Sequence, residues 1–186
     1  MKASNILILI IVLVIAGAAW WLYGNNKNDT NPNPVITSFA ECAAAGYPIA
    51  ESYPEQCRTP DGRVFVREIG NENDKSDLIR VDSPRPGETV SSPLTITGAA
   101  RGFWYFEASF PVEIRDEAGN ILVQAPVQAQ GEWMTEEFVP FAATLDFTLP
   151  SSGAGELILR KDNPSSLPAN DDELVIPIVF ATTTAN

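Results

Sequence analysis

The chain holds few of the side chains that enzymes use as nucleophiles, general bases or metal ligands. Its 186 residues include no histidine and two cysteines, Cys42 and Cys57. Without histidine, Ser-His-Asp and Cys-His catalysis are excluded and the commonest zinc ligand is missing. Two cysteines cannot supply the four ligands of a structural zinc site. Because the sequence also contains no phosphate-binding loop, dinucleotide-binding fingerprint or Gly-x-Ser-x-Gly motif, we expect a protein that is not an enzyme and holds no metal or cofactor.

Glu107 has the surroundings that best suit a catalytic carboxylate. It lies in the stretch WYFEASF, residues 104–110, with aromatic residues on both sides. A carboxyl group among aromatic rings can have a raised pKa and act as an acid. It can also accept hydrogen bonds from backbone amides and fix the crossing of a strand, which is the usual way in which a buried charge is satisfied. The sequence leaves both interpretations open.

Two further groups of side chains could bind a ligand. Aromatic residues could form a platform for a sugar or a peptide, or could belong to a hydrophobic core and its rim, where large aromatic residues are common. With the carboxylate above, this possible binding surface comprises Trp104, Tyr105, Glu107, Trp133 and Phe141. The side chains that could converge on calcium, or simply form a solvated acidic loop, are Asp162, Asn163, Asp171, Asp172 and Glu173. Their spacing matches no calcium-binding loop, so we expect no metal there.

The first element of the chain is an apolar stretch without charges, Ile6 to Tyr23. As a helix rising about 1.5 Å per residue it would cover roughly 27 Å, close to the ~30 Å hydrocarbon thickness of a bilayer. A cleaved signal peptide is the alternative, because residues 16–19 are small enough for a cleavage site. Trp20, Trp21 and Tyr23 favour an anchor, since such rings lie at the lipid–water boundary. We therefore predict that the chain contacts the lipid bilayer through this stretch.

Charges beside the apolar stretch predict its orientation. Lys2 and the free amino terminus make a short positive flank, whereas Lys27 beyond the stretch is offset by Asp29. Positive flanks remain in the cytoplasm, so we expect a single-pass cell-membrane protein whose C-terminal domains are extracytoplasmic. In that oxidising space Cys42 and Cys57 are expected to form a disulfide, whereas two reduced thiols would contradict this orientation. The bond would close a loop of about 15 residues and be worth ~3 kcal/mol.

Composition divides the remaining chain into alternating polar and patterned segments. Ser38 followed by Glu41 is a capping-box pattern that predicts a short helix from about Phe39 to Ala45. A module this small lacks the core to fold firmly alone, which is a structural reason for a disulfide. The predicted order is a transmembrane anchor at 1–24, a linker at 25–34, a small α+β disulfide-clipped module at 35–69, a second polar linker at 70–77 and a β domain at 78–182.

The last segment has the alternation of strands that bury one face. Two of its runs predict inward faces made of Leu94, Ile96 and Gly98 and of residues 110, 112 and 114. Pro177 inside the last run should confine that strand to a sheet edge, because proline donates no ladder hydrogen bond. About seven strands without a convincing helix predict an antiparallel β-sandwich of immunoglobulin type. The seven runs are 78–82, 93–100, 110–116, 121–130, 143–149, 156–160 and 173–180.

The stretch from about Ile79 to Phe180 resembles the immunoglobulin-like domain of bacterial spore germination and sporulation proteins. The residues that carry the resemblance are Val81, Ser83, Pro84, Pro86 and Gly87, then Val90, Ser92, Pro93, Leu94, Ile96, Thr97 and Gly98, the FEASF string 106–110, the turn at Asp116 and Gly119, and the segment Phe138–Phe141. The resemblance implies an extracytoplasmic module joined to varied partner domains behind a signal or anchor. It does not imply a spore-forming host. The segment 35–69 also resembles a small cysteine-pair module found beside such domains in envelope proteins.

The net charge of the chain restricts the classes of partner that it can bind. The net charge is −12, which disfavours nucleic acid, because phosphate binding depends on clustered Lys and Arg. We expect a non-catalytic binding, adhesion or assembly protein of the bacterial envelope, with another envelope protein or a cell-wall glycan as partner. The alternative is an accessory domain of an envelope hydrolase or germination apparatus acting on cell wall, with Glu107 as an acid.

Overall fold

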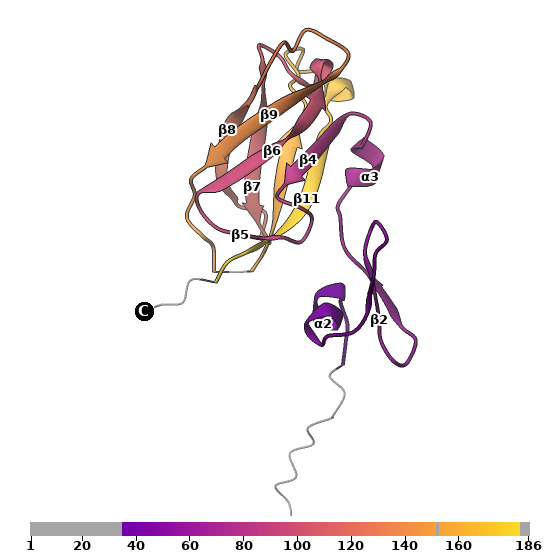
Figure 1. Ribbon diagram of the computed structural model, residues 1–186. Coiled ribbons are helices and arrows are strands. Elements are labelled where there is room, and N and C mark those ends of the chain that lie inside the picture. The colour runs from indigo at the N-terminus through magenta and orange to yellow at the C-terminus, as the bar shows by residue number, and fades with distance from the viewer. Residues whose placement is uncertain (1–34, 152, 183–186) are drawn as a thin grey trace, which may run out of the picture. The chain divides into compact units, whose positions relative to one another are not determined.

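The computed structural model describes residues 35–151 and 153–182 (Figure 1). The predicted anchor at Ile6–Tyr23 and the linker at 25–34 lie outside the described residues and remain predictions. Within the described part of the chain, no helix is both long and apolar enough to span a bilayer.

A helix and three short strands make up the small module, which we define here as residues 37–69. They are α2 (Phe39–Ala44), β1 (Ile49–Ala50), β2 (Gln56–Arg58) and β3 (Val64–Val66), with the strands in the antiparallel order β1-β2-β3. The Ser38 side chain accepts a hydrogen bond of 3.1 Å from the Glu41 amide, which confirms the predicted N-cap. Cys42 on α2 and Cys57 on β2 form the predicted disulfide, and both are fully buried.

Eight strands and three short helices follow in the remainder of the described chain. They are α3 (Glu72–Lys75), β4 (Ile79–Ser83), β5 (Thr89–Val90), β6 (Leu94–Arg101), η1 (Gly102–Trp104), β7 (Ser109–Asp116), β8 (Ile121–Ala129), β9 (Phe138–Leu145), β10 (Ala154–Arg160), η2 (Pro168–Asn170) and β11 (Glu173–Phe180). The strands are hydrogen-bonded in the order β4-β6-β9-β8-β7-β10-β11-β5. Strands β8 and β9 pair at two positions only, so β4-β6-β9 and β8-β7-β10-β11-β5 form two layers of a sandwich (Figure 1).

The core lies between these layers and comes from alternate residues of the strands. In β6 every second residue is buried, from Leu94 through Ile96 and Gly98 to Ala100, which confirms the predicted inward face. Phe110, Val112 and Ile114 of β7 are fully buried as well. The largest fully buried side chains of the core are Trp104, Phe110, Phe141, Phe180, Ile79, Ile96, Ile114, Leu157, Leu159, Leu174, Ile176 and Ile178.

The structure corrects the predicted strands in number and position. The prediction of about seven strands omits β5, which has two residues and pairs in parallel with Val179 and Phe180 of β11. The predicted strand at 143–149 ends at Leu145 and begins at Phe138 instead. Phe147, beyond the strand end, still packs on the core: its ring lies 6.0 Å from that of Phe180. An alternating pattern therefore continued past the hydrogen-bonded strand.

The stretch predicted as the second linker is folded against the outer side of β11. Asn71 is half-buried; its side chain accepts a 2.8 Å hydrogen bond from the Val175 amide and donates a 2.9 Å bond to the Glu173 carbonyl. Gly70 has φ +64, and a Cβ there would collide with the Val175 carbonyl.

β5 pairs only with the end of β11, at Val179 and Phe180. The contacts of Asn71 and Gly70 cover the same edge of β11 before Pro177, where β5 does not reach. The prediction that Pro177 confines its strand to a sheet edge is therefore wrong for β11 as a whole, because β11 lies between β10 and β5. The pairs with β5 do not include Pro177.

Candidate functional site

Three loops meet at one end of the sandwich, which we call the loop end. They are the β6–β7 loop (102–108), the β8–β9 loop (130–137) and the β10–β11 loop (161–172). Backbone hydrogen bonds connect them: the Gly102 amide donates to the Glu137 carbonyl at 3.1 Å, and the Asp162 amide donates to the Trp104 carbonyl at 3.0 Å. The three loops lie together at the top of Figure 1. The loop end is thus one connected surface.

The β6–β7 loop is held by a close approach and a tight turn. A Cβ on Gly102 would collide with the carbonyls of Trp133 and Thr135, so only glycine fits there. Glu107 and Ala108 both have positive φ, 50° and 62°, and hydrogen bonds run both ways between residues 106 and 109. Positive φ at both central residues is what a two-residue hairpin turn of type I′ requires. This turn presents Phe106 and Glu107 to solvent.

The β10–β11 loop is held by its own polar side chains. The Asn163 side-chain amide donates to the Leu167 carbonyl at 2.9 Å and to the Asp171 carboxylate at 2.6 Å. The Ser165 hydroxyl donates to the Asn163 side-chain oxygen at 2.5 Å and accepts from the Asn170 amide at 2.9 Å. These bonds explain why a loop without strands has a defined shape.

Large apolar side chains are exposed on all three loops. A cavity of 380 Å³ beside the first and third loops is lined by Phe103, Phe106, Asp162 and neighbouring residues. Burial raises the pKa of the Asp162 carboxyl group, and the negative charge of Glu107 raises it further. The exposed apolar residues of the loop end are Phe103 (50% exposed), Phe106 (41%), Met134 (74%) and Leu167 (59%). Such a concentration at one end is typical of an interaction surface.

The part of the chain that contains most of the sandwich matches a known family of protein domains. Residues 78–166 match the family model of the immunoglobulin-like domain of bacterial spore germination. The resemblance seen in the sequence is thereby confirmed for this part of the chain. The match covers β4 to β10 and two of the three loops completely, whereas β11 lies beyond it. No curated protein matches the chain.

Within this immunoglobulin-like domain, three members of the predicted binding surface are core residues. Trp104 is 0%, Tyr105 3% and Phe141 2% exposed. The rings of Tyr105 and Phe141 pack edge-on against Phe110, with centroids 5.1 and 5.2 Å away, and the Tyr105 hydroxyl donates to the Val139 carbonyl at 2.7 Å. Burial raises the pKa of Tyr105 to about 12. These aromatic residues therefore carry the loop end rather than form its surface.

The other two members lie at the loop end but not in the expected roles. Glu107 is exposed in its turn. It is neither enclosed by the aromatic rings nor a buried acceptor of amides, so both interpretations of it are corrected. Trp133 is half-buried against the core. The exposed aromatic residues are instead Phe103 and Phe106, which sequence reasoning missed because a tightly spaced aromatic run gives no sign of which rings turn outward.

The predicted acidic group does not form a metal cluster in the described chain. Asp172 pairs with Lys75 at 2.5 Å and Glu173 pairs with Arg160 at 2.7 Å, so cations of the protein already occupy these carboxylates. Asp171 accepts from Asn163. No group of three His, Cys, Asp or Glu residues that could hold a metal ion occurs among residues 35–151 and 153–182.

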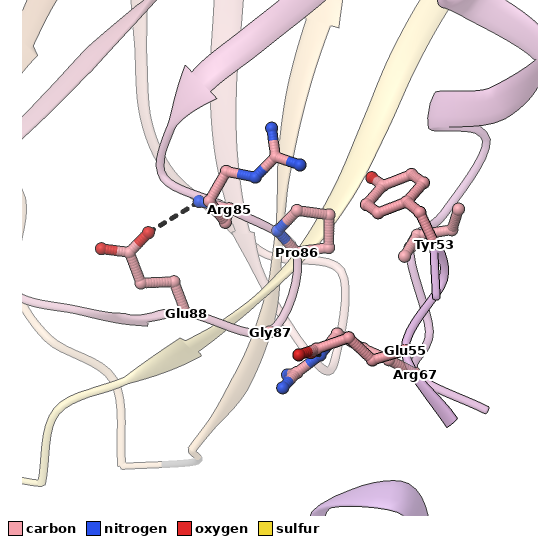
Figure 2. A pocket seen from close by; sticks show the side chains of 8 residues that line it. Tyr53, Glu55, Arg67, Arg85, Pro86, Gly87 and Glu88 are labelled. Carbon is pink, nitrogen blue, oxygen red and sulfur yellow. Dashed lines mark hydrogen bonds and ion pairs between the residues drawn. The ribbon is translucent and has the colours of Figure 1, made fainter. Parts of the chain in front are cut away.

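A second cavity lies where the module meets the β4–β5 loop. It measures 470 Å³, and Figure 2 shows Tyr53, Glu55 and Arg67 of the module facing the turn of residues 85–88. Arg67 pairs with Glu55, which also lines the cavity, at 2.5 Å, and Arg85 pairs with Glu72, which lies outside the lining, at 3.8 Å. The Tyr53 hydroxyl also donates to the Glu72 carboxylate. This cavity therefore belongs to a contact within the chain, which we call the junction.

Proposed function

We propose that the chain is a single-pass, membrane-anchored and non-catalytic binding protein of the bacterial envelope, which presents its immunoglobulin-like domain outside the cell. The family match supports an envelope- or germination-associated domain, and the apolar stretch Ile6–Tyr23 supports the anchor. The partner is another envelope component, and the loop end is the surface that contacts it.

One observation carries the binding role, namely the four exposed apolar side chains on loops that the fold holds in place. Exposed residues such as Met134 and Leu167 do not stabilise the sandwich, because their surface remains in contact with water. Loops on a stable scaffold are also where binding residues concentrate. The exposed parts of Phe103 and Phe106 would leave water in a complex, and this burial would stabilise the complex.

Cross-linking in intact cells tests this proposal. A photo-activated cross-linking residue is placed at Met134 at the loop end of the full chain, and at Ile121 as the matched control. Ile121 is also exposed, at 51%, but begins β8 at the opposite end of the sandwich. We expect a discrete product from position 134 that is absent from position 121 and lost when Phe103 and Phe106 are both replaced by serine. Identical products from both positions, or a product that survives the two serines, would contradict the binding role.

Placement outside the cell is tested separately. Cys42 and Cys57 form a disulfide in the structure, and such bonds persist in extracytoplasmic space. We expect a reporter fused behind Asn186 to be active outside the cytoplasm and thiol labelling of unreduced cells to leave both cysteines unmodified. A reporter active only in the cytosol would refute the orientation without affecting the loop end.

The hydrolase alternative rests on Glu107. That alternative depends on a carboxylate enclosed by aromatic rings, and Glu107 is exposed in a turn. The structure offers no specific observation in favour of this alternative, so we propose no catalytic role.

A further inference from the structure

We infer that the loop end recognises a positively charged protein segment in which basic and apolar side chains alternate. This inference rests on the proposed binding function and names the chemistry of the partner. Three features of the loop end support it: its charge, its exposed aromatic rings beside a carboxylate, and its rigidity.

The loop end concentrates the negative charge of the chain. The loops at the opposite end carry the three acidic residues Glu88, Glu117 and Asp146 against Arg85, a net charge of −2. The three loops at 102–108, 130–137 and 161–172 carry one basic residue, Lys161, against seven acidic residues, a net charge of −6. Two of the seven are paired with cations of neighbouring elements, Asp172 with Lys75 and Glu137 with Arg101. The other five, which are in none of the ion pairs of the described residues, are Glu107, Glu132, Glu136, Asp162 and Asp171. A surface with such a charge attracts cationic partners and repels acidic ones.

The cavity at the loop end combines groups that bind ammonium or guanidinium ions. Phe103 and Phe106 line it and are exposed, and a cation over an aromatic face is stabilised by the ring quadrupole. Asp162 lines it too, and none of the ion pairs of the described chain includes Asp162. Lys161 reaches the same cavity and is the cation with which an incoming basic side chain would compete.

The Glu107 carboxylate is close enough to affect the Asp162 carboxyl group. The charge of Glu107 contributes to the raised pKa of Asp162, after burial as the larger cause. A cation placed between the two would reduce this repulsion and favour the ionised form of Asp162. Phe106 is in the same turn as Glu107, so one incoming side chain can contact a ring and a carboxylate together.

The exposed apolar side chains of the loop end indicate that the partner contributes apolar side chains as well as charges. Met134 and Leu167 stand on the other two loops and are among the most exposed apolar residues of the described chain. A polycation alone would leave them in water, whereas alternating apolar side chains would bury them. Because the loops are already held by hydrogen bonds, binding would cost little conformational entropy at this surface.

Defined peptides test the inference on the full chain inserted in nanodiscs of neutral phosphatidylcholine, with empty nanodiscs as the blank. The probe is a synthetic peptide of alternating lysine and leucine. Two matched peptides replace lysine by glutamate, or leucine by serine. We expect the first peptide to bind by calorimetry and both others to bind at least about tenfold more weakly. Raising the salt from about 0.1 M to about 1 M shortens the Debye length from about 10 Å to about 3 Å and should weaken binding by a similar factor.

Matched variants locate the binding. Glu132→Gln with Glu136→Gln removes two charges from the loop end, and Glu88→Gln with Glu117→Gln removes two from the opposite end. We expect only the first pair to weaken binding and its salt dependence. Phe103→Ser with Phe106→Ser should weaken binding about tenfold. None of the four glutamine substitutions, which are all at exposed positions, should change the melting temperature.

The outcomes separate this inference from the proposed function. Equal binding of the glutamate peptide, or loss of binding on replacing Glu88 and Glu117 instead, would refute the cationic partner. So would binding of a neutral chito-oligosaccharide at Phe103 and Phe106 without binding of the lysine peptide; the loop end would then still be a binding surface, for a glycan. If cross-linking at Met134 fails as well, the proposed function fails with it.

Discussion

The small module and the sandwich are stabilised in different ways. The sandwich has one continuous core, and every residue of that core cluster lies between Ile79 and Phe180. In the module, residues 37–69, the buried apolar residues are Phe39, Cys42, Cys57 and Ile69. A disulfide and the junction take the place of the missing core there. The comparison teaches that a short segment with almost no apolar interior can keep a defined shape through one covalent bond and contacts with a larger neighbour.

The largest effect should come from emptying the middle of the sandwich. Phe110 is 0% exposed and packs between Tyr105 and Phe141. Phe110→Ala leaves a cavity that the strands cannot close, so we expect about 3–5 kcal/mol of lost unfolding free energy in urea titration. The disulfide of the module should still form, as judged by thiol titration. A loss below about 1 kcal/mol would mean that this core is less well packed than the structure indicates.

The next effect should come from the disulfide and should be confined to the module. Replacing Cys42 and Cys57 together by serine removes a constraint worth ~3 kcal/mol on the entropy model. We expect amide hydrogen exchange to speed up in β2 and β3, because these strands lack a core of their own. Exchange in β6 and β7 should not change, since their core residues do not contact the bond. Faster exchange in both parts would show that the two are one cooperative unit.

A smaller effect should come from the outer face of the sandwich, where ion pairs rather than apolar contacts stabilise the fold. Glu113 is 5% exposed and accepts from Arg115 at 2.6 Å and from Arg160 at 3.2 Å. Glu113→Gln keeps the shape but leaves two guanidinium groups without their carboxylate, so we expect about 1–2 kcal/mol of lost stability in urea titration. Both arginines are one-third exposed and remain partly solvated, which limits the loss. Glu156→Gln, on an exposed position of β10, is the control and should have no effect.

Sequence alone predicted the parts of the fold that follow from periodicity. The inward faces of β6 and β7 are regular because each strand buries one side only. β5 was not predicted, because two residues are too few to show an alternating pattern. The strand at Phe138–Leu145 was predicted too far along the chain, at 143–149, because Phe147 continues the apolar alternation beyond the last paired residue. The disulfide was predictable because the chain has only two cysteines.

The candidate site was less predictable for a physical reason. Whether an aromatic residue such as Trp104 or Phe106 is buried depends on where the chain turns. In the β6–β7 loop the turn is made by Glu107 and Ala108 in left-handed conformations. Glutamate and alanine rarely adopt this conformation, so the sequence does not predict the turn. The convergence of three loops at one end depends on strand pairing over long distances in the sequence. Charge was visible from the start, but its concentration at the loop end became visible only with the topology.

The smallest effect should come from the junction and would show how far the module depends on the sandwich. The Tyr53 hydroxyl donates to the Glu72 carboxylate, which is almost buried. Tyr53→Phe removes this bond, and since Tyr53 is half-exposed we expect about 0.5–1 kcal/mol of lost stability, seen as faster amide exchange in β3. Val64→Ala, at a similarly exposed apolar position of the module, is the control and should leave that exchange nearly unchanged.

The dependence of the junction on pH follows from the same bond. Burial raises the pKa of Tyr53 to about 12, and the hydrogen bond to Glu72 and its charge add to the shift. Because an unfolded tyrosine has a pKa of about 10, the folded chain holds this proton more tightly. The stabilisation is therefore complete below pH about 10 and is lost as pH rises through about 12. Amide exchange in β3, corrected for the intrinsic effect of base, should speed up over this range in the wild type and not in Tyr53→Phe. An equal response of the two proteins would mean that the module does not depend on this contact, and that its disulfide alone keeps it folded.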